Sequence, residues 1–151
     1  RMNVNTIRYF STFMTGELFA ALTQHTNLGR LMTNAEDEDG FARGVRDGFS
    51  TDEKEGGVLS KLYGARALPL LEMMQPAAVK DYISGLLLGT EIQEAVKSGY
   101  GLNVTPVIIG SADLVERYKK ALEICGIRTE SANDDLAAFG LYRTACAAKL
   151  M

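Results

Sequence analysis

Hydrophobic residues recur at helical spacing through most of the chain, and short runs of β-branched and aromatic residues interrupt that pattern. One such run ends at Gly110, and a long amphipathic stretch from Ala112 to Cys125 follows it. Pro76 suits the first turn of another helix, whose apolar residues continue for about twenty positions. We therefore predict an α/β chain with, in order, a strand at 6–13, a helix at 15–25, helices and polar loops at 27–75, a helix at 76–96, a strand ending at 110, a helix at 112–125, a short strand at 127–130 and a final helix capped by Asn133 or Asp134.

The middle third, residues 27–75, carries helical signals without a convincing strand, and we interpret it as a helical insertion. Phe41, Val45 and Phe49 recur at helical spacing, and a glycine precedes each of them. Such a glycine stripe permits close packing against a neighbouring helix. The acidic run at 34–39 lacks the alternating ligands of a calcium loop, so we expect a solvated helix start there and no metal site.

The helix predicted at 76–96 is apolar nearly all round at its centre, which predicts burial. Gly85 and Gly89 are four residues apart and share one face. Close helix packing is the favoured interpretation of this pair, and direct contact with a ligand is the alternative.

The turn at Gly110 and Ser111 is the first candidate for a ligand site. Ligands of open α/β sheets bind at the carboxyl ends of strands, and this turn joins a strand to a helix. Glycine allows close approach to the backbone, and the helix start offers unpaired N–H groups. Asp113 in the first helical turn would repel a phosphate, so a neutral group such as a nucleoside fits better. A purely structural turn, with Ser111 as an ordinary N-cap, stays open.

Two further features come from the same helical patterns. Thr15, Gly16 and Glu17 form a second turn between a predicted strand and a helix, in which Thr15 can act as the cap. His25 at the end of that helix is predicted to be structural. In the helix at 112–125, the pattern assigns to the buried face Leu114, Val115, Tyr118, Ala121, Leu122 and Cys125, and to the outer face Glu116, Arg117, Lys119, Lys120 and Glu123.

Composition narrows the classes of function. The chain has 151 residues, is 46% hydrophobic and carries a net charge of −3, which suits one globular domain. No basic stripe is present, so we expect no nucleic-acid partner and no anionic membrane surface. The most apolar stretch, residues 83–88, is far shorter than a membrane span, and no signal-peptide pattern opens the sequence, so we expect a cytoplasmic location. Cys125 and Cys146 lie on apolar faces without metal-ligand spacing, so we predict buried thiols and no bound metal.

Three stretches together resemble one enzyme family. They are Phe10-Ser-Thr-Phe-Met-Thr-Gly-Glu-Leu-Phe19, Tyr82-Ile-Ser-Gly-Leu-Leu-Leu-Gly-Thr-Glu-Ile92 and Val107-Ile-Ile-Gly-Ser111. In these stretches the chain resembles the carboxyl-terminal half of the 2-dehydro-3-deoxygalactonokinases. The resemblance implies a ribonuclease-H-like domain of the sugar-kinase, heat-shock-ATPase and actin superfamily. It also implies transfer of the γ-phosphate of ATP, with Mg²⁺, to the 6-hydroxyl of 2-dehydro-3-deoxy-D-galactonate.

The resemblance also assigns candidate residues. Gly110 and Ser111 would form the adenosine-binding turn, and Gly89 would let the long helix approach the nucleotide. The turn at 15–17 matches a family signature without an assigned chemistry, so Thr15, Gly16 and Glu17 are candidates for the substrate or phosphate side. The family's Asp-Trp-Gly-Thr-Thr and Pro-Gly-Thr-His-Ser-Lys-Trp segments do not occur here, and we expect them before Arg1. The chain supplies no obvious set of groups for phosphoryl transfer, so we name no catalytic base and expect the isolated chain to be inactive.

A second class of function competes with the kinase. The chain can instead be a non-catalytic nucleotide-binding or interaction module with the same half-fold, in which the glycine faces serve packing or dimerisation. The sequence leaves a homodimer open. The sequence upstream of Arg1 distinguishes the two classes, because a phosphate-binding motif there would favour the kinase.

Overall fold

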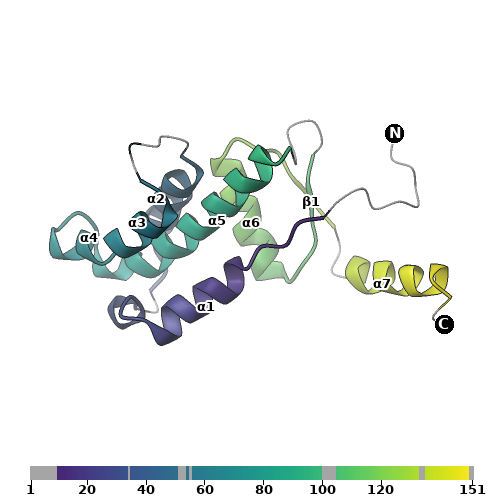
Figure 1. The fold of residues 1–151 in the computed structure, drawn as a ribbon, viewed down its shortest axis with the longest axis horizontal. Coiled ribbons are helices and arrows are strands. Elements are labelled where there is room, and N and C mark those ends of the chain that lie inside the picture. The colour runs from purple at the N-terminus through teal and green to yellow at the C-terminus, as the bar shows by residue number, and fades with distance from the viewer. Residues whose placement is uncertain are drawn as a thin grey trace.

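The computed structural model describes residues 10–33, 35–50, 54, 56–99, 105–132 and 135–149. Helices dominate the described chain, and two very short strands accompany them (Figure 1). The described elements are α1 (Thr15–His25), the 3-10 turn η1 (Gly29–Leu31), α2 (Glu38–Phe49), α3 (Val58–Gly64), α4 (Ala67–Leu70), the 3-10 turn η3 (Pro76–Ala78), α5 (Val79–Lys97), β1 (Val107–Ile108), α6 (Ala112–Ile124), β2 (Glu130–Ser131) and α7 (Asp135–Ala147). The helix-rich order predicted from hydrophobic spacing is confirmed for these residues.

Helices α2 and α5 form the centre of the molecule, and their backbones touch. A Cβ added to Gly44 would lie 2.1 Å from the carbonyl oxygen of Tyr82, and one added to Gly85 would lie 2.2 Å from that of Phe41. No real side chain fits at such distances. The glycines of both helices are therefore required for this contact, which confirms the prediction of close packing.

The hydrophobic core lies on both sides of this helix pair. On one side the buried residues are Leu28, Leu62, Ala65, Val79, Tyr82, Ile83, Leu86 and Leu87, with side chains of α1 and α3 packed against them. On the other side they are Phe41, Val45, Leu88, Ile92, Ala121 and Leu122, which join α2 and α5 to α6. This second cluster fixes α6, the helix that follows the predicted ligand turn.

Strands β1 and β2 pair in parallel, with Val107 opposite Glu130 and Ile108 opposite Ser131. Helix α6 connects them and ends at Ile124. Gly126 follows its C-cap Cys125, and its φ of +74° is the left-handed conformation that glycine adopts without steric cost. The second strand thus begins at the end of the predicted range 127–130 and extends one residue beyond it. The predicted order of strand, helix and strand is confirmed, although each strand is only two residues long and the first ends at Ile108 and not at Gly110.

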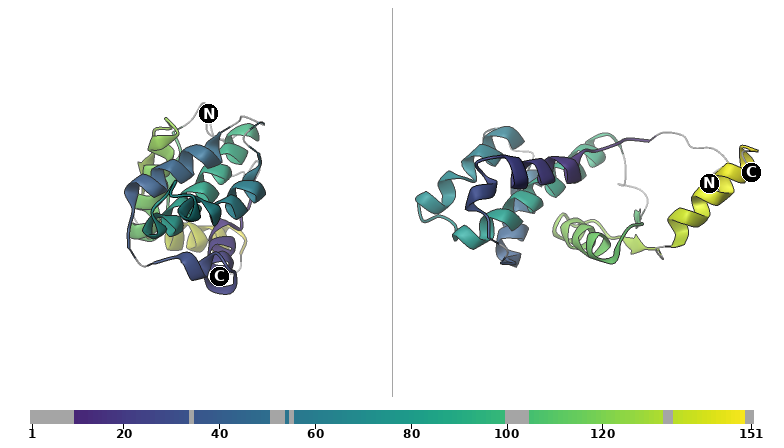
Figure 2. Two further views of the ribbon diagram at one scale, coloured as in Figure 1. Left: turned by 90° about the vertical axis from the view of Figure 1, so that its left-hand side faces the viewer. Right: turned by 90° about the horizontal axis from the view of Figure 1, so that it is seen from below.

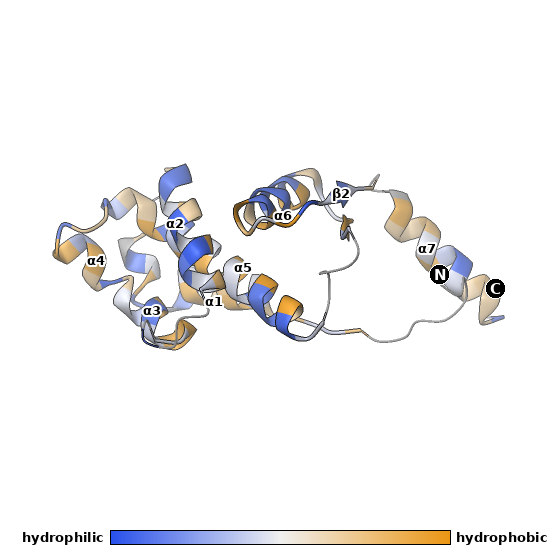
Figure 3. Ribbon diagram, turned by 90° about the horizontal axis from the view of Figure 1, so that it is seen from above, coloured by the Kyte–Doolittle hydropathy of each residue, from blue (hydrophilic) through white to orange (hydrophobic). Residues whose placement is uncertain are grey.

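Helix α7 projects away from the helical body in Figure 1 and in the right-hand view of Figure 2. Its hydrophobic residues are visible along its length in Figure 3 and include Phe139, which is 56% exposed. Cys146 is also exposed, so the prediction of a buried thiol there is wrong. Cys125 is partly covered, and burial raises its pKa to about 11.

Three other local predictions need correction. Of the strand predicted at 6–13, residues 6–9 lie outside the described part, and residues 10–13 form no strand. Thr15 is the first helical residue, and Met14 occupies the N-cap position without a side-chain capping bond. Leu114 was assigned to the buried face of its helix but is 50% exposed. The buried residues of α6 are Val115, Ala121 and Leu122.

Two remaining expectations concern the caps of the last helix and a membrane span. Asn133 and Asp134, the predicted caps of the last helix, lie outside the described residues. No helix within the described ranges is long and apolar enough to cross a membrane.

Candidate functional site

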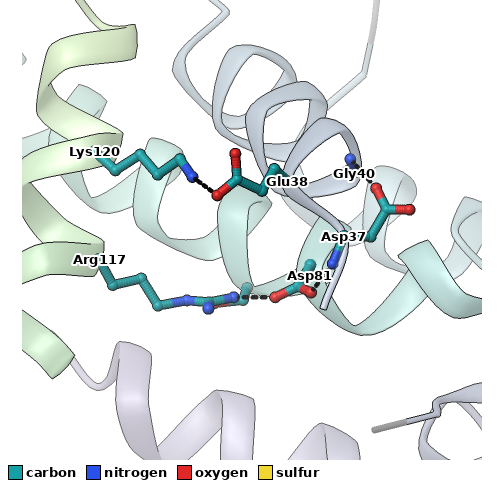
Figure 4. Close-up of polar contacts among 7 residues, drawn as sticks. Asp37, Glu38, Gly40, Asp81, Arg117 and Lys120 are labelled. Carbon is teal, nitrogen blue, oxygen red and sulfur yellow. Dashed lines mark hydrogen bonds and ion pairs between the residues drawn. The ribbon is translucent and has the colours of Figure 1, made fainter. Parts of the chain in front are cut away.

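A cavity of about 320 Å³ opens between the start of α2, the first turns of α5 and the exposed side of α6. Helix α6 begins directly after the predicted ligand turn at Gly110 and Ser111, and four of its residues line the cavity, although the two turn residues themselves do not. Figure 4 shows the polar side chains that face one another there. We call it the carboxylate-lined cavity, and its lining residues are Glu36, Asp37, Glu38, Phe41, Asp81, Asp113, Glu116, Arg117 and Lys120.

The first wall of the cavity is the start of α2. Asp37 is the N-cap of this helix, and its carboxylate accepts a hydrogen bond from the N–H of Gly40 at 2.6 Å. Glu38 in the first turn adds a second negative charge, which the helix dipole favours. This result confirms that the acidic run at 34–39 contains a helix start, with Asn34 outside the described residues.

The second wall is α6, and Arg117 attaches it to the other two helices. The guanidinium pairs with the buried Asp81 carboxylate of α5, and its Nε donates to Ser84 Oγ at 2.9 Å. Its Cζ also lies 4.6 Å from the ring centre of Phe41 in α2, a cation–π contact. One planar side chain thus contacts α5 and α2 from α6. Arg117 was predicted on the outer face of its helix, and the structure shows it half-buried at a helix junction.

A more exposed ion pair joins the same two walls. Lys120 Nζ lies 2.5 Å from Glu38 Oε1, and the side chains are 40% and 82% exposed. Exposed pairs of this kind contribute little to stability because water screens them. Their effect is on the charge at the mouth of the cavity.

The charge of the lining limits the ligand. Six carboxylate side chains and two cationic side chains surround the cavity. Negative charge at this density repels phosphate groups, whereas carboxylate oxygens accept hydrogen bonds from hydroxyl and amino groups. The cavity therefore suits a neutral, donor-rich group such as a nucleoside, which extends the expectation drawn from Asp113 alone.

The cavity does not fit a magnesium ion. Asp37 caps α2, Asp81 binds Arg117, and Glu38 binds Lys120, so these carboxylates are engaged by other donors. Among the residues that the structure describes, no group of three or more His, Cys, Asp and Glu side chains is arranged to hold a metal ion.

Gly110 and Ser111 lie where the sequence placed them, between β1 and α6. Ser111 occupies the N-cap position in extended conformation, yet its hydroxyl makes no capping bond. Gly110 does not have the left-handed conformation, and an added Cβ would make ordinary contacts with Leu114 at 3.7 Å and Val115 at 3.9 Å. Neither backbone strain nor crowding within the described chain requires glycine at this position.

The other predicted site residues lie elsewhere. Gly89 is buried, and a Cβ there would be 2.3 Å from the carbonyl oxygen of Val45, so packing against α2 accounts for this glycine. Thr15, Gly16 and Glu17 form the first turn of α1 and are not among the cavity's lining residues. Gly110 and Ser111 are not lining residues either, and their turn is related to the cavity only through α6, which it precedes and whose Asp113 lines the cavity.

Sequence reasoning did not identify Asp81 and Arg117. A signal for Asp81 exists, because it is a charged residue in the first turn of a helix that is otherwise mostly buried. A buried carboxylate needs a partner, although the sequence does not reveal which cation supplies it.

Comparison with known proteins identifies the family. The family described as 2-keto-3-deoxy-galactonokinase matches residues 1–144. The chain belongs to this kinase family. It is 32% identical over 138 residues to a probable 2-dehydro-3-deoxygalactonokinase of Rhizobium meliloti (strain 1021), and 27% identical over 132 residues to the 2-dehydro-3-deoxygalactonokinase of Escherichia coli (strain K12). The resemblance noted in the sequence is thereby confirmed.

The matches cover nearly all of this chain but only part of each relative. The alignments cover 91% and 87% of this chain but 45% and 44% of the relatives, so the chain spans about half their length. A crystal structure of a Sinorhizobium meliloti protein assigned as a 2-dehydro-3-deoxygalactonokinase gives a TM-score of 0.75 at 31% identity. That match covers 92% of this chain and 46% of the solved one. The fold described here is therefore similar to about half of a kinase structure.

Proposed function

We propose that this chain is the carboxyl-terminal, nucleotide-binding half of an ATP-dependent kinase that phosphorylates 2-dehydro-3-deoxy-D-galactonate at its 6-hydroxyl. Membership of the 2-keto-3-deoxy-galactonokinase family supports the reaction and its substrate class. The alignment with about half of each relative supports the assignment to one half of the enzyme.

The carboxylate-lined cavity is the observation that carries the nucleotide-binding role. It lies on α6 directly after the Gly110–Ser111 turn, and its lining favours hydroxyl and amino donors over phosphate. A nucleoside carries such donors on its ribose and base, so we place the nucleoside of ATP here. The phosphates would extend out of the cavity, because six carboxylates disfavour them inside it.

Phosphoryl transfer requires groups that this cavity does not provide. Cationic, metal or backbone donors must surround the transferred phosphoryl group. Arg117 and Lys120 are the cationic side chains of the lining, and both are paired with carboxylates. We therefore assign no catalytic base in this chain and expect the reacting groups, with Mg²⁺, to be held by the other half of the enzyme.

An ADP-release assay tests this function. We expect the full-length polypeptide that contains this chain to release ADP from Mg²⁺-ATP in the presence of 2-dehydro-3-deoxygalactonate, and residues 1–151 alone to release none. The gluconate-derived epimer serves as the substrate control. Turnover by residues 1–151 alone would contradict the proposal of half an active site. ATP binding without turnover by the full-length polypeptide would instead favour the non-catalytic module.

A further inference from the structure

Asp81 connects the two walls of the carboxylate-lined cavity. It lies in the first turn of α5 and is only 6% exposed. Its Oδ2 accepts a hydrogen bond from the backbone N–H of Asp37 at 2.8 Å, at the start of α2. Its Oδ1 pairs with the guanidinium of Arg117 in α6. Both oxygens of one carboxylate are thus used, each by a different wall (Figure 4).

Besides the exposed Lys120–Glu38 pair, polar contacts hold α6 at two places along α5. Arg117 reaches Asp81 and Ser84 on the cavity side of the helix. On a different part of the α5–α6 contact, the Tyr118 hydroxyl donates to Glu91 Oε2 at 2.9 Å. Burial and the nearby Glu91 carboxylate raise the pKa of Tyr118, so its phenol stays protonated and keeps this bond. The Arg117 contacts on the cavity side of α6 can therefore be removed by mutation while the Tyr118–Glu91 bond is kept.

We propose that Asp81 is a positioning residue for nucleoside binding. This inference rests on the proposed function. By holding Asp37 and Arg117 at once, Asp81 sets the separation between the start of α2 and α6, and with it the width of the cavity. The carboxylate acts through the two segments it joins and needs no contact with the ligand itself.

Asp81→Asn in the full-length polypeptide tests the proposal. Asparagine keeps the shape but has one acceptor oxygen, so its NH₂ group must face either the Asp37 N–H or the Arg117 guanidinium, both donors. We expect the dissociation constant of ATP to rise about tenfold or more, as for the loss of one good contact. The Michaelis constant for the sugar acid should change less than twofold.

Two further variants sharpen the test. Arg117→Lys keeps the charge but loses the planar fork that reaches Asp81 and Ser84, so it should weaken ATP binding in the same direction. This variant decides the question if Asp81→Asn does not fold. Tyr118→Phe is the matched control, since it removes the Tyr118–Glu91 bond, a polar connection between α5 and α6 that lies away from the cavity. It should lower the melting temperature while leaving the ATP dissociation constant within twofold of the parent.

An ATP-independent measurement separates this inference from the proposed function. The Val115 N–H bonds the Ser111 carbonyl at 2.9 Å in the first turn of α6, and its hydrogen exchange should be faster in Asp81→Asn than in Tyr118→Phe. Folded variants with parental ATP affinity and parental exchange would overturn the positioning role. Failure of the parent to bind ATP would overturn the proposed function, and the exchange result would still decide whether Asp81 holds α6.

Discussion

The reason for a glycine at position 110 distinguishes a ligand-binding turn from a purely structural one. A structural turn needs glycine when the backbone is left-handed or when a neighbour would collide with a Cβ. Neither condition holds at Gly110 within the described chain. Close approach of a ligand is a remaining reason for glycine, which makes this residue a clean position for substitution.

We predict that Gly110→Val weakens ATP binding with little effect on the fold. The side chain would lie beside Leu114 and Val115 in the first turn of α6, the helix whose Asp113 lines the cavity. If a nucleoside approaches this turn, loss of one or two contacts corresponds to a rise of about ten- to a hundredfold in the Michaelis constant for ATP. The constant for the sugar acid should stay near its parental value. Steady-state kinetics of the full-length enzyme in each substrate, with melting temperatures, measure both effects.

Ser111→Ala is the control for the structural role of the same turn. Loss of a side-chain cap typically costs about 1 kcal/mol, but the Ser111 hydroxyl makes no capping bond, so we expect a smaller loss of stability. The ATP kinetics should be unchanged. A Gly110→Val enzyme with a parental ATP constant would show that this turn does not line the nucleotide site.

The sequence predicted where single residues lie along the helices, but not which residues their side chains contact. Ser111 is at the N-cap position that the pattern predicted, yet the expected side-chain bond is absent. Arg117 was assigned to the outer face because helical spacing places it outside the apolar stripe of its helix. Its cation instead lies over Phe41 and beside Asp81, residues 76 and 36 positions away in the sequence. Such long-range pairs follow from tertiary packing, which helical periodicity does not describe.

The α2–α5 pair shows how far a sequence pattern can specify an element contact. Glycines at 40, 44 and 48 and at 85 and 89 predicted a close approach, and each of these glycines faces backbone or Cβ atoms of a neighbouring element. What the pattern could not give was the partner of each stripe. Two glycine faces can pack on each other within one chain or on a second copy, and here they meet within the chain.

We predict that Gly85→Ala destabilises the fold through this contact. Its Cβ would lie 2.2 Å from the Phe41 carbonyl oxygen, so the helices must separate, and overpacking of this kind costs about 1–3 kcal/mol. Gly16→Ala is the matched control, because nothing lies within 4 Å of its added Cβ in an exposed helical turn. It should stabilise α1 by about 0.5–1 kcal/mol, since alanine favours helix.

Denaturant unfolding of both variants against the parent measures this difference. An unchanged midpoint for Gly85→Ala would mean that the two helices do not touch as described. A loss of stability in Gly16→Ala equal to that in Gly85→Ala would show that the effect is not specific to the interface.

At the scale of the whole molecule, periodicity predicted the helices well and the sheet poorly. Helical spacing is a local property, whereas strand pairing depends on which segments meet. Only two residues of each strand pair here, although the valine and isoleucine run leading to Gly110 is longer. The sequence also could not predict that apolar side chains of α7 are exposed, because an apolar helix is buried only where another surface covers it.

Hydrogen exchange of the full-length polypeptide, with and without a non-hydrolysable ATP analogue and Mg²⁺, tests the central claim most directly. We predict slower exchange in peptides that cover the start of α6 (residues 112–118) and the start of α2 (residues 37–41), which form the cavity walls. Peptides of α3, on the other side of the helix pair, should be unchanged. Saturating analogue that leaves both wall segments unprotected, or that protects α3 instead, would contradict the assignment of the carboxylate-lined cavity as the nucleoside site.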